Sequence, residues 1–295
     1  MCTPDVRSST ALSGCTVAQA SSLLPTPGAG WKPALLFLCL VFCAGITAAH
    51  AEAPFTALRD GERFRFQIAW GIFSNAGEIV MEAHRETTAA SDLVRVQTRI
   101  SSRGFVRGVY KFDNTSELVI DRATGRLLTA TEEGTGGSQG THTRTLFDYE
   151  RRLATHRDSL RPQRDREFPL GAADPVDLIT ALIQTRDWHL RLGEHRSVEV
   201  YFGRDIYPVV IRAEKRESVK TPLGTFVTTQ LVPRMETEAP RGVFQRGGEI
   251  KVWVSDGDDS QPVQMQLQLN FGSARLTLVE HAFVTPNPTV PEGSP

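Results

Sequence analysis

Cysteine is confined to the N-terminal part of this 295-residue chain. The residues Cys2, Cys15, Cys39 and Cys43 all precede position 51, where we expect a leader to be removed. The mature chain then contains no cysteine, which excludes disulfide bonds, thiol catalysis and thiolate metal sites. A secreted domain without disulfide bonds must bury a core of its own, and residues 52–295 are numerous enough to do so.

Long runs of charge of one sign are absent. Without Arg7, Lys32 and Asp5, the 33 basic and 34 acidic residues become 31 and 33, a net charge near −2. A nucleic-acid-binding protein typically carries a clustered basic face, and a protein that binds anionic membranes typically has a polybasic segment. The sequence favours neither class, and we expect no nucleic-acid partner.

A hydrophobic run long enough to span a membrane is missing, although a shorter one is present. The apolar run Ala34–Ile46 follows Lys32 and precedes Ala49-His50-Ala51, which is the arrangement of a secretory signal peptide. Because a spanning helix needs about 20 apolar residues, permanent anchoring is the less favoured interpretation. We expect residues 31–51 to be a signal peptide cleaved after Ala51, which leaves a periplasmic or secreted protein without a stable transmembrane span.

The segments that flank the expected domain are poor in core-forming residues. Residues 1–30 are rich in Ser, Thr, Ala and Pro, and they precede the signal where a compact basic region normally begins. They form either a disordered extension or a segment upstream of the true translation start. Residues 286–295 are proline-rich and are expected to be disordered. Residues 52–285 remain as a single β-rich domain.

Alternation of apolar and polar residues is the dominant pattern of this domain. From Val263 to Phe271, for example, apolar residues alternate with glutamine and asparagine, which predicts a half-buried antiparallel strand. Turn-forming sequences such as Asp121–Gly125 and Thr221–Gly224 separate such segments. The predicted strands cover residues 64–70, 79–83, 94–100, 109–120, 127–132, 143–149, 198–202, 207–216, 226–233, 250–255, 263–271 and 275–283.

One segment has helical rather than strand periodicity. Asp174 is the expected N-cap, Pro175 the first helical residue, and apolar residues then recur at helical spacing up to Ile183. We expect a helix from Pro175 to about Trp188. Such a helix either packs across the concave face of the sheet, plugs its opening, or lies between two half-barrels. The expected fold is mainly β: a strongly curved antiparallel sheet or open barrel of about a dozen strands with one packed helix.

Motifs for catalysis or metal binding have weak support. Gly136–Gly140 matches the Gly-x-Ser-x-Gly motif of a nucleophile elbow around Ser138. However, it lies between two predicted strands, which favours a hairpin turn over a catalytic elbow. Asp256–Ser260 lacks the later ligands of an EF-hand, which leaves a looser calcium site or an acidic turn. The mature histidines are dispersed and show no zinc-binding spacing. We expect no enzyme activity, no catalytic or metal-binding residues and no cofactor.

The order of several short signals resembles the bacterial domain-of-unknown-function family 3108. The matching pieces are Gly61-Glu62, Ala76-Gly77, Asp174 to Arg186, Leu223-Gly224-Thr225-Phe226, Val252-Trp253-Val254-Ser255-Asp256 and Gln261-Pro262-Val263. The resemblance covers about Leu58 to Glu280. It implies an exported bacterial envelope protein, and it carries no catalytic residues to transfer.

The leading hypothesis is a non-enzymatic periplasmic protein that binds or carries an apolar envelope molecule beside the helix. The ligand would be a lipid, a lipoprotein acyl chain or a lipid-linked glycan. An alternative is an envelope scaffold or protein-interaction module with a filled core, and a less favoured one is a hydrolase that uses Ser138. Arg186, Trp188 and Arg191 at the helix end either meet an anionic headgroup or compensate the helix dipole. The candidate ligand-binding residues are Trp70, Phe73, Met81, Leu182, Arg186, Trp188 and Trp253.

Overall fold

One predominantly antiparallel sheet organises the part of the chain that the structure describes. This computed structural model describes residues 54–136, 140–245, 248–257, 259–269 and 272–284. The predicted N-terminal extension, signal peptide and C-terminal tail lie outside these residues, and so does Ser138. The predicted domain boundaries therefore stay predictions.

Fifteen strands form this sheet within the described residues. They are β1 (Glu62–Trp70), β2 (Phe73–Thr87), β3 (Asp92–Ser102), β4 (Asp113–Asp121), β5 (Leu127–Gly134), β6 (Thr141–Asp148), β7 (Leu153–Asp158), β8 (Arg166–Pro169), β9 (Val176–Asp177), β10 (His195–Phe202), β11 (Asp205–Thr221), β12 (Gly224–Arg234), β13 (Glu249–Ser255), β14 (Pro262–Leu269) and β15 (Gly272–Phe283).

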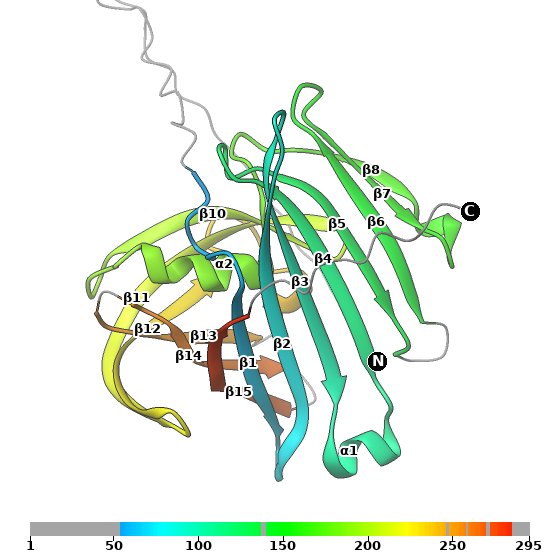
Figure 1. Ribbon diagram of the computed structural model, residues 1–295. Coiled ribbons are helices and arrows are strands. Elements are labelled where there is room, and N and C mark those ends of the chain that lie inside the picture. Colours follow the sequence, from blue (N-terminus) through cyan, green and yellow to red (C-terminus); the bar gives the residue numbers. More distant parts are fainter. Residues whose placement is uncertain (1–53, 137–139, 246–247, 258, 270–271, 285–295) are drawn as a thin grey trace, which may run out of the picture. The chain divides into compact units, whose positions relative to one another are not determined.

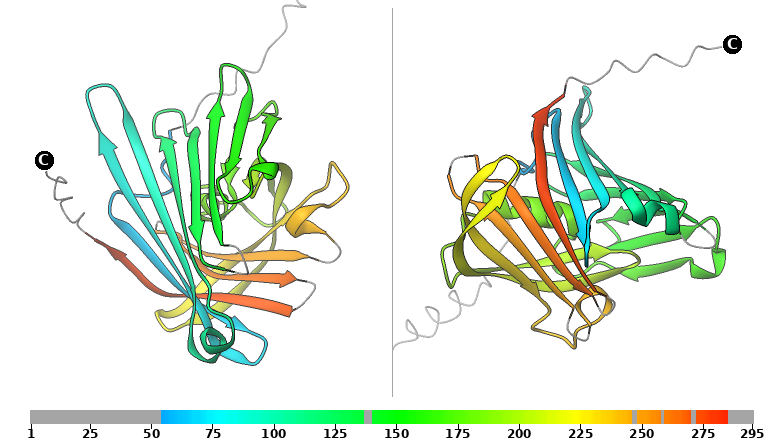
Figure 2. Two further views of the ribbon diagram at one scale, coloured as in Figure 1. Left: turned by 90° about the vertical axis from the view of Figure 1, so that its right-hand side faces the viewer. Right: turned by 90° about the horizontal axis from the view of Figure 1, so that it is seen from below.

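Most neighbouring strands in the sheet are also consecutive in the sequence, as in a meander. The exception is the pairing of the first strand, β1, with the last, β15, in the middle of the sheet. Strand β1 pairs with both β2 and β15, and the order across the sheet is β8-β7-β6-β5-β4-β3-β2-β1-β15-β14-β13-β12-β11-β10-β9. Strands β8 and β9 are the two edges, and β9 pairs with β10 in parallel. The sheet is therefore open between β8 and β9, and its two halves run at a steep angle to each other around a central helix (Figures 1 and 2).

The prediction of a mainly antiparallel β fold that is not closed is confirmed, although the strand count was too low. The missed strands are β7, β8 and β9. Strand β8 has four residues and ends at Pro169, and β9 has two, so neither is long enough to show alternation. The predicted strand over 109–120 was wrong at its start, because residues up to Val109 belong to a helix, α1 (Gly104–Val109).

Helix α2 (Leu178–Gln184) occupies the predicted helical segment but begins later than expected. The N-cap is Asp177, whose carboxylate accepts hydrogen bonds from the backbone N–H groups of Ile179 (2.9 Å) and Thr180 (3.2 Å). The prediction of Asp174 as N-cap was wrong, because β9 pairs with β10 and keeps the chain extended as far as Asp177. A short 3₁₀ helix, η2 (Thr185–Asp187), continues α2.

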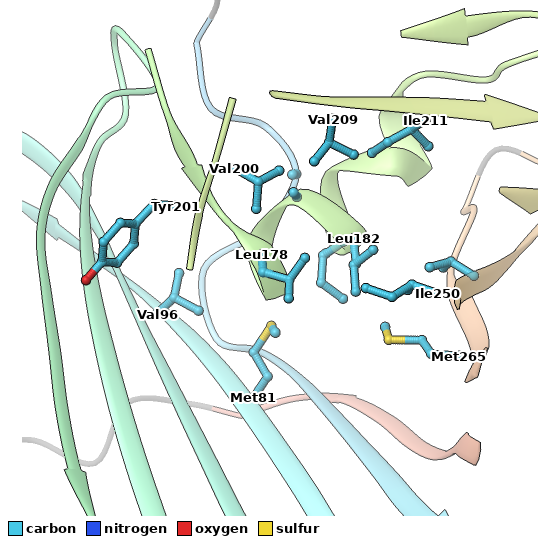
Figure 3. Packing of buried hydrophobic residues seen from close by; sticks show 14 of the residues in the cluster. Met81, Val96, Leu178, Leu182, Val200, Tyr201, Val209, Ile211, Ile250 and Met265 are labelled. Carbon is cyan, nitrogen blue, oxygen red and sulfur yellow. The ribbon is translucent and has the colours of Figure 1, made fainter. Parts of the chain in front are cut away.

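The core of the domain surrounds α2. Leu178 and Leu182 project from the helix toward side chains of both halves of the sheet, including Met81 of β2 and Met265 of β14 (Figure 3). The buried residues of α2 are Leu178, Thr180, Ala181, Leu182 and Ile183. The helix thus fills the concave face of the sheet with apolar side chains, which agrees with the expected packed helix.

Side chains join the two halves of the sheet near the open edge. The Tyr201 hydroxyl of β10 lies 2.7 Å from the Thr145 hydroxyl of β6, which in turn lies 2.8 Å from Nδ1 of His156 in β7. Tyr201 also packs edge-on against Phe147 at 5.1 Å between ring centroids. These buried contacts, and not backbone pairing, link β10 to β6 and β7.

The direction of this hydrogen-bond chain fixes the form of His156. The Tyr201 hydroxyl donates to the carbonyl of Gly203, so it must accept from Thr145, and Thr145 must accept from Nδ1–H of His156. Nδ1 then carries the proton and Nε2 is bare, with no hydrogen-bond partner among the described residues. Burial lowers the pKa of His156, because protonation of Nε2 would bury an unpaired donor.

The remaining helical segments are short. They are η1 (Pro162–Arg164) and η3 (Gly242–Phe244), and α1 has no buried residue. Of these, only η3 contributes a described side chain, that of Phe244, to the core. In the ranges that the structure describes, no helix is both long and apolar enough to cross a membrane.

Candidate functional site

A half-open groove of about 580 Å³ lies beside the end of α2. We call it the end groove. It is lined by Pro54–Ala57 of the N-terminal segment, Thr124–Arg126 of the β4–β5 turn, Arg152, Ala172–Asp174 and Val176 before α2, Gln184, Asp187 and Trp188 at the helix end, and Arg196–Glu199 of β10. Segments far apart in the sequence therefore build one depression, in which apolar and charged side chains are mixed.

Trp188 and Arg196 form the most distinctive pair in the end groove. The guanidinium carbon of Arg196 lies 4.8 Å from the centre of the Trp188 ring, within the range of a cation–π contact. Trp188 directly follows η2 and is half-buried, whereas Arg196 is exposed on β10. Arg196 forms no ion pair with any described residue, so its N–H edges are available to a ligand.

The other two arginines of the groove are held by one carboxylate. Asp174 accepts from Nε of Arg126 at 2.8 Å and from Nη1 of Arg152 at 2.6 Å. Burial of Asp174 opposes ionisation, but these two hydrogen bonds outweigh it and lower its pKa. Arg126 also lies over the Tyr149 ring at 4.9 Å. This brace ties the segment before α2 to the β4–β5 and β6–β7 turns, and thereby fixes one wall of the groove.

The C-terminal end of α2 is anchored by a buried ion pair. Both carboxylate oxygens of Glu62, which is fully buried, accept from Arg186 at 2.8 and 3.1 Å. Nε2 of His281 lies 2.8 Å from the same carboxylate, and the backbone N–H of Arg59 donates to it at 2.9 Å. Strands β1 and β15 thus hold the end of the helix in one position.

The charge of Glu62 is maintained by these partners. Burial favours the neutral carboxyl group, but the hydrogen bonds from His281, Arg186 and Arg59 outweigh burial and lower the pKa of Glu62 to about 2. An ionised carboxylate can only accept, so Nε2 of His281 carries a proton in this contact. Glu62 is therefore a structural anion and not a proton donor near neutral pH.

The candidate ligand-binding residues are not brought together in one place. Trp188 lines the end groove. Met81, Leu182 and Trp253 are buried within the hydrophobic core. Arg186 is also buried, with its guanidinium bound to Glu62, and it borders a smaller pocket of about 140 Å³.

Trp70 and Phe73 lie elsewhere, on either side of the β1–β2 turn. Trp70 packs partly buried against the core, and the Phe73 ring stacks on Phe105 of α1 at 5.4 Å. This turn lies at the bottom of the view in Figure 1, away from α2. The seven candidate ligand-binding residues thus lie in four places: the hydrophobic core, the Glu62–Arg186 ion pair, the end groove and the region around the β1–β2 turn and α1.

Arg196 is the groove residue that sequence reasoning missed. It lies eight positions after Trp188, with a turn between them, so their contact depends on how β10 returns past the helix end. The sequence did offer one signal, a tryptophan at a helix end followed by basic residues. That signal did not distinguish Arg196 from Arg191. Arg191 is exposed and does not line the groove.

The described residues show no arrangement typical of metal binding. No group of three or more His, Asp or Glu side chains among them could hold a metal ion. In the acidic turn, Asp256 pairs with Arg216 at 2.6 Å and Asp259 pairs with Arg59 at 2.6 Å, so both carboxylates have basic partners. The residue between them in the motif, Asp258, lies outside the described residues.

The fold and the groove define a class of protein: an open antiparallel sheet curled around one helix, with a mixed polar and apolar groove at its end. The chain belongs to DUF3108, a family of proteins of unknown function, whose model matches residues 65–279. The predicted family is therefore confirmed. The search of the curated proteins found no match.

The solved structures that are similar to the chain include the following three. A β-barrel-like protein of the DUF1849 family from Brucella abortus shares 8% identity at a TM-score of 0.49, with 76% of this chain and 98% of that chain covered. A candidate lipoprotein from Parabacteroides distasonis has 11% identity and a TM-score of 0.29, with coverages of 76% and 96%. A candidate exported protein with a YmcC-like fold from Bacteroides fragilis has 11% identity and a TM-score of 0.31, with coverages of 78% and 99%.

Proposed function

We propose that this protein is an exported, non-enzymatic binding protein of the bacterial envelope that holds an amphiphilic molecule in the end groove. The observation that carries the proposal is the Trp188–Arg196 stack, in which Arg196 has no acidic partner among the described residues. An indole face and a free guanidinium edge together suit a ligand with an apolar part and an anionic group. The signal-peptide pattern in residues 31–51 supports an exported location.

The size and lining of the groove support a small ligand. Ligand pockets have volumes of roughly 300–1,000 Å³, and the end groove measures about 580 Å³. Apolar contact would come from Trp188, Val176 and Val198, whereas Arg126 and Arg152 are both engaged by hydrogen bonds to Asp174. Arg196 is therefore the residue to which an anionic group would bind.

The interior of the curved sheet is filled with side chains, which argues against a ligand site there. Leu182 of α2 and Met81 of β2 were both expected to contact a ligand. Both are almost fully buried in the hydrophobic core (Figure 3). An acyl chain placed there would have to displace α2. We therefore assign the ligand to the end groove, and the ligand class remains a lipid, an acyl chain or a lipid-linked glycan.

A second candidate function is an envelope scaffold or protein-interaction module. The same filled interior favours it, because a packed core leaves binding to the surface. Under this alternative the protein would carry no stoichiometric small molecule. The two functions therefore differ in a quantity that can be measured directly.

The test is native mass spectrometry of protein purified from a bacterial periplasm, before and after denaturation. We expect a mass excess that disappears on denaturation. We expect Arg196→Gln to lower the occupancy roughly fivefold or more, because a charge-assisted hydrogen bond is lost. Arg164→Gln is the matched control, since Arg164 is an exposed arginine on η1 outside the groove and should leave occupancy unchanged.

Trp188→Ala tests the apolar half of the site. This variant should also lower the occupancy, while its thermal unfolding should show that the domain remains folded. A bare mass for the wild-type protein would contradict the proposal and favour the interaction module. Equal occupancy in wild-type, Arg196→Gln and Trp188→Ala proteins would place the ligand outside the end groove.

A further inference from the structure

A second surface lies where α1 and the β1–β2 turn protrude from the sheet (Figure 1). Four large side chains there are exposed: Ile72 (92%), Val109 (75%), Phe105 (70%) and Tyr110 (51%). We call these residues, together with Lys111, the α1 tip. Single exposed apolar residues are ordinary, but a cluster on two adjacent protruding segments marks a binding surface.

The α1 tip is held in shape by its own contacts. The ring of Phe105 stacks on Phe73 at 5.4 Å, and Arg107 forms two hydrogen bonds with the Asp113 carboxylate at 2.8 and 3.0 Å. At Gly104, which has a φ of +52°, a Cβ atom would lie 2.7 Å from the carbonyl oxygen of Asn75, so glycine permits the close approach of α1 to β2. The apolar side chains are therefore displayed by an ordered element.

The charge around the tip is positive. Arg107 is paired with Asp113, and Arg103 is paired with Glu78 at 2.7 Å. Lys111 is exposed, and no described residue forms an ion pair with it. Both nearby carboxylates are thus occupied, and the tip presents an unpaired cation beside its apolar side chains.

This combination identifies the partner. The tip of a second copy would offer the same lysine and the same two occupied carboxylates, so it would supply no complementary charge. A bilayer with anionic headgroups instead accepts apolar side chains at its interface and attracts lysine. We infer that the α1 tip docks the protein on an anionic lipid surface, with Phe105, Val109 and Ile72 inserted among the headgroups and acyl chains.

The position of the tip separates this inference from the proposed ligand. Strand β4 starts at Asp113, just after the tip, and ends at Asp121, before the turn that lines the end groove. A strand of this length spans about 25–30 Å. The groove therefore lies at the far end of β4 from the docked surface, and variants of the tip should leave ligand occupancy unchanged.

The experiment is flotation of the periplasm-purified protein with two kinds of vesicle. One contains phosphatidylethanolamine with phosphatidylglycerol, and the other contains phosphatidylcholine alone. The double variant Phe105→Ser with Val109→Ser should partition at least roughly tenfold less, because two apolar side chains no longer enter the interface. Lys111→Glu should reduce partition roughly tenfold on the anionic vesicles only, because a favourable charge becomes a repulsive one.

A matched double variant controls for the loss of exposed apolar residues in general. Leu192→Ser with Val227→Ser changes two exposed residues outside the tip and should float like the wild-type protein. Equal flotation of the Phe105/Val109 variant and the wild-type protein would overturn the inference. So would a concentration-dependent dimer in sedimentation that this variant abolishes, because the tip would then bind a second copy.

Discussion

Helices α1 and α2 have opposite relations to the same sheet. Helix α2 buries five of its seven residues in the concave face, whereas α1 buries none of its six. Both sequences are rich in apolar residues, so hydrophobicity alone does not distinguish them. The difference indicates that α2 stabilises the fold, and that the apolar residues of α1 serve contacts outside it.

The ends of the two helices also differ in how their arginines are used. Arg186, after α2, is buried and bound by Glu62, whereas Arg107 of α1 is half-exposed and bound by Asp113. A buried pair is costly to break on one side, because the remaining charge cannot regain its hydration. A surface pair contributes little to stability. The comparison therefore predicts which substitutions unfold the protein and which change only its contacts.

The largest effect is expected at the anchor of α2. Glu62→Gln should lower the free energy of unfolding by about 3–5 kcal/mol, because Arg186 is left buried without a counterion. Glu150→Gln, at an exposed glutamate, is the control and should change it by less than about 0.5 kcal/mol. Urea denaturation measures both values, and equal stability of the two variants would show that the ion pair does not hold the helix.

The same anchor makes the protein sensitive to acid. The pKa of Glu62 falls from 4.5 to about 2 on folding, so its stabilisation is complete above pH 4.5 and is lost as the pH falls toward 2. The loss over this window should be about 3 kcal/mol. Denaturation measured between these pH values should show that wild-type protein loses more stability than Glu62→Gln, and parallel curves would contradict the assignment.

The next largest effect on stability is expected from truncating a buried side chain of α2, compared with an exposed one of α1. Leu182→Ala on α2 should destabilise the protein by about 2–5 kcal/mol, because it leaves a cavity in the core. Val109→Ala on α1 should change stability by less than about 0.5 kcal/mol, because the side chain is already in water. Thermal or chemical unfolding measures the difference, and a similar loss in both variants would remove the distinction between the helices.

The smallest effect is expected at the open edge of the sheet. Tyr201→Phe removes the hydroxyl that joins Thr145 to Gly203, and should cost about 1–3 kcal/mol. It should also increase hydrogen exchange in β7 and β10. Unchanged exchange there would show that backbone contacts elsewhere hold the two halves of the sheet together.

Local patterns predicted much of this fold because most strands have one buried face. Alternation identified β14, and capping chemistry together with helical spacing identified α2. The exact start of α2 was missed because Asp174 and Asp177 are both good N-caps, and only the pairing of β9 with β10 decides between them. Helix α1 was not predicted, and its last residue, Val109, was placed in a strand because Val109 and Tyr110 favour strands in isolation.

The site was predicted only in part, because its contacts join distant segments. Trp188 was recognisable at a helix end, but the Arg196 contact depends on the path of β10. The Glu62–Arg186 pair spans 124 positions and leaves no local signal. The α1 tip was missed for the same reason, since the chain has no polybasic segment and the surface forms only when α1 is placed beside the β1–β2 turn.

The central claim is that the two ends of the sheet have separate roles, and hydrogen exchange on vesicles tests it most directly. The wild-type protein would be compared with and without vesicles that contain phosphatidylglycerol. We predict slower exchange in residues 103–112 and around Ile72, with no change in residues 184–199 beside the end groove. Protection at the groove, or no protection at α1, would contradict the account.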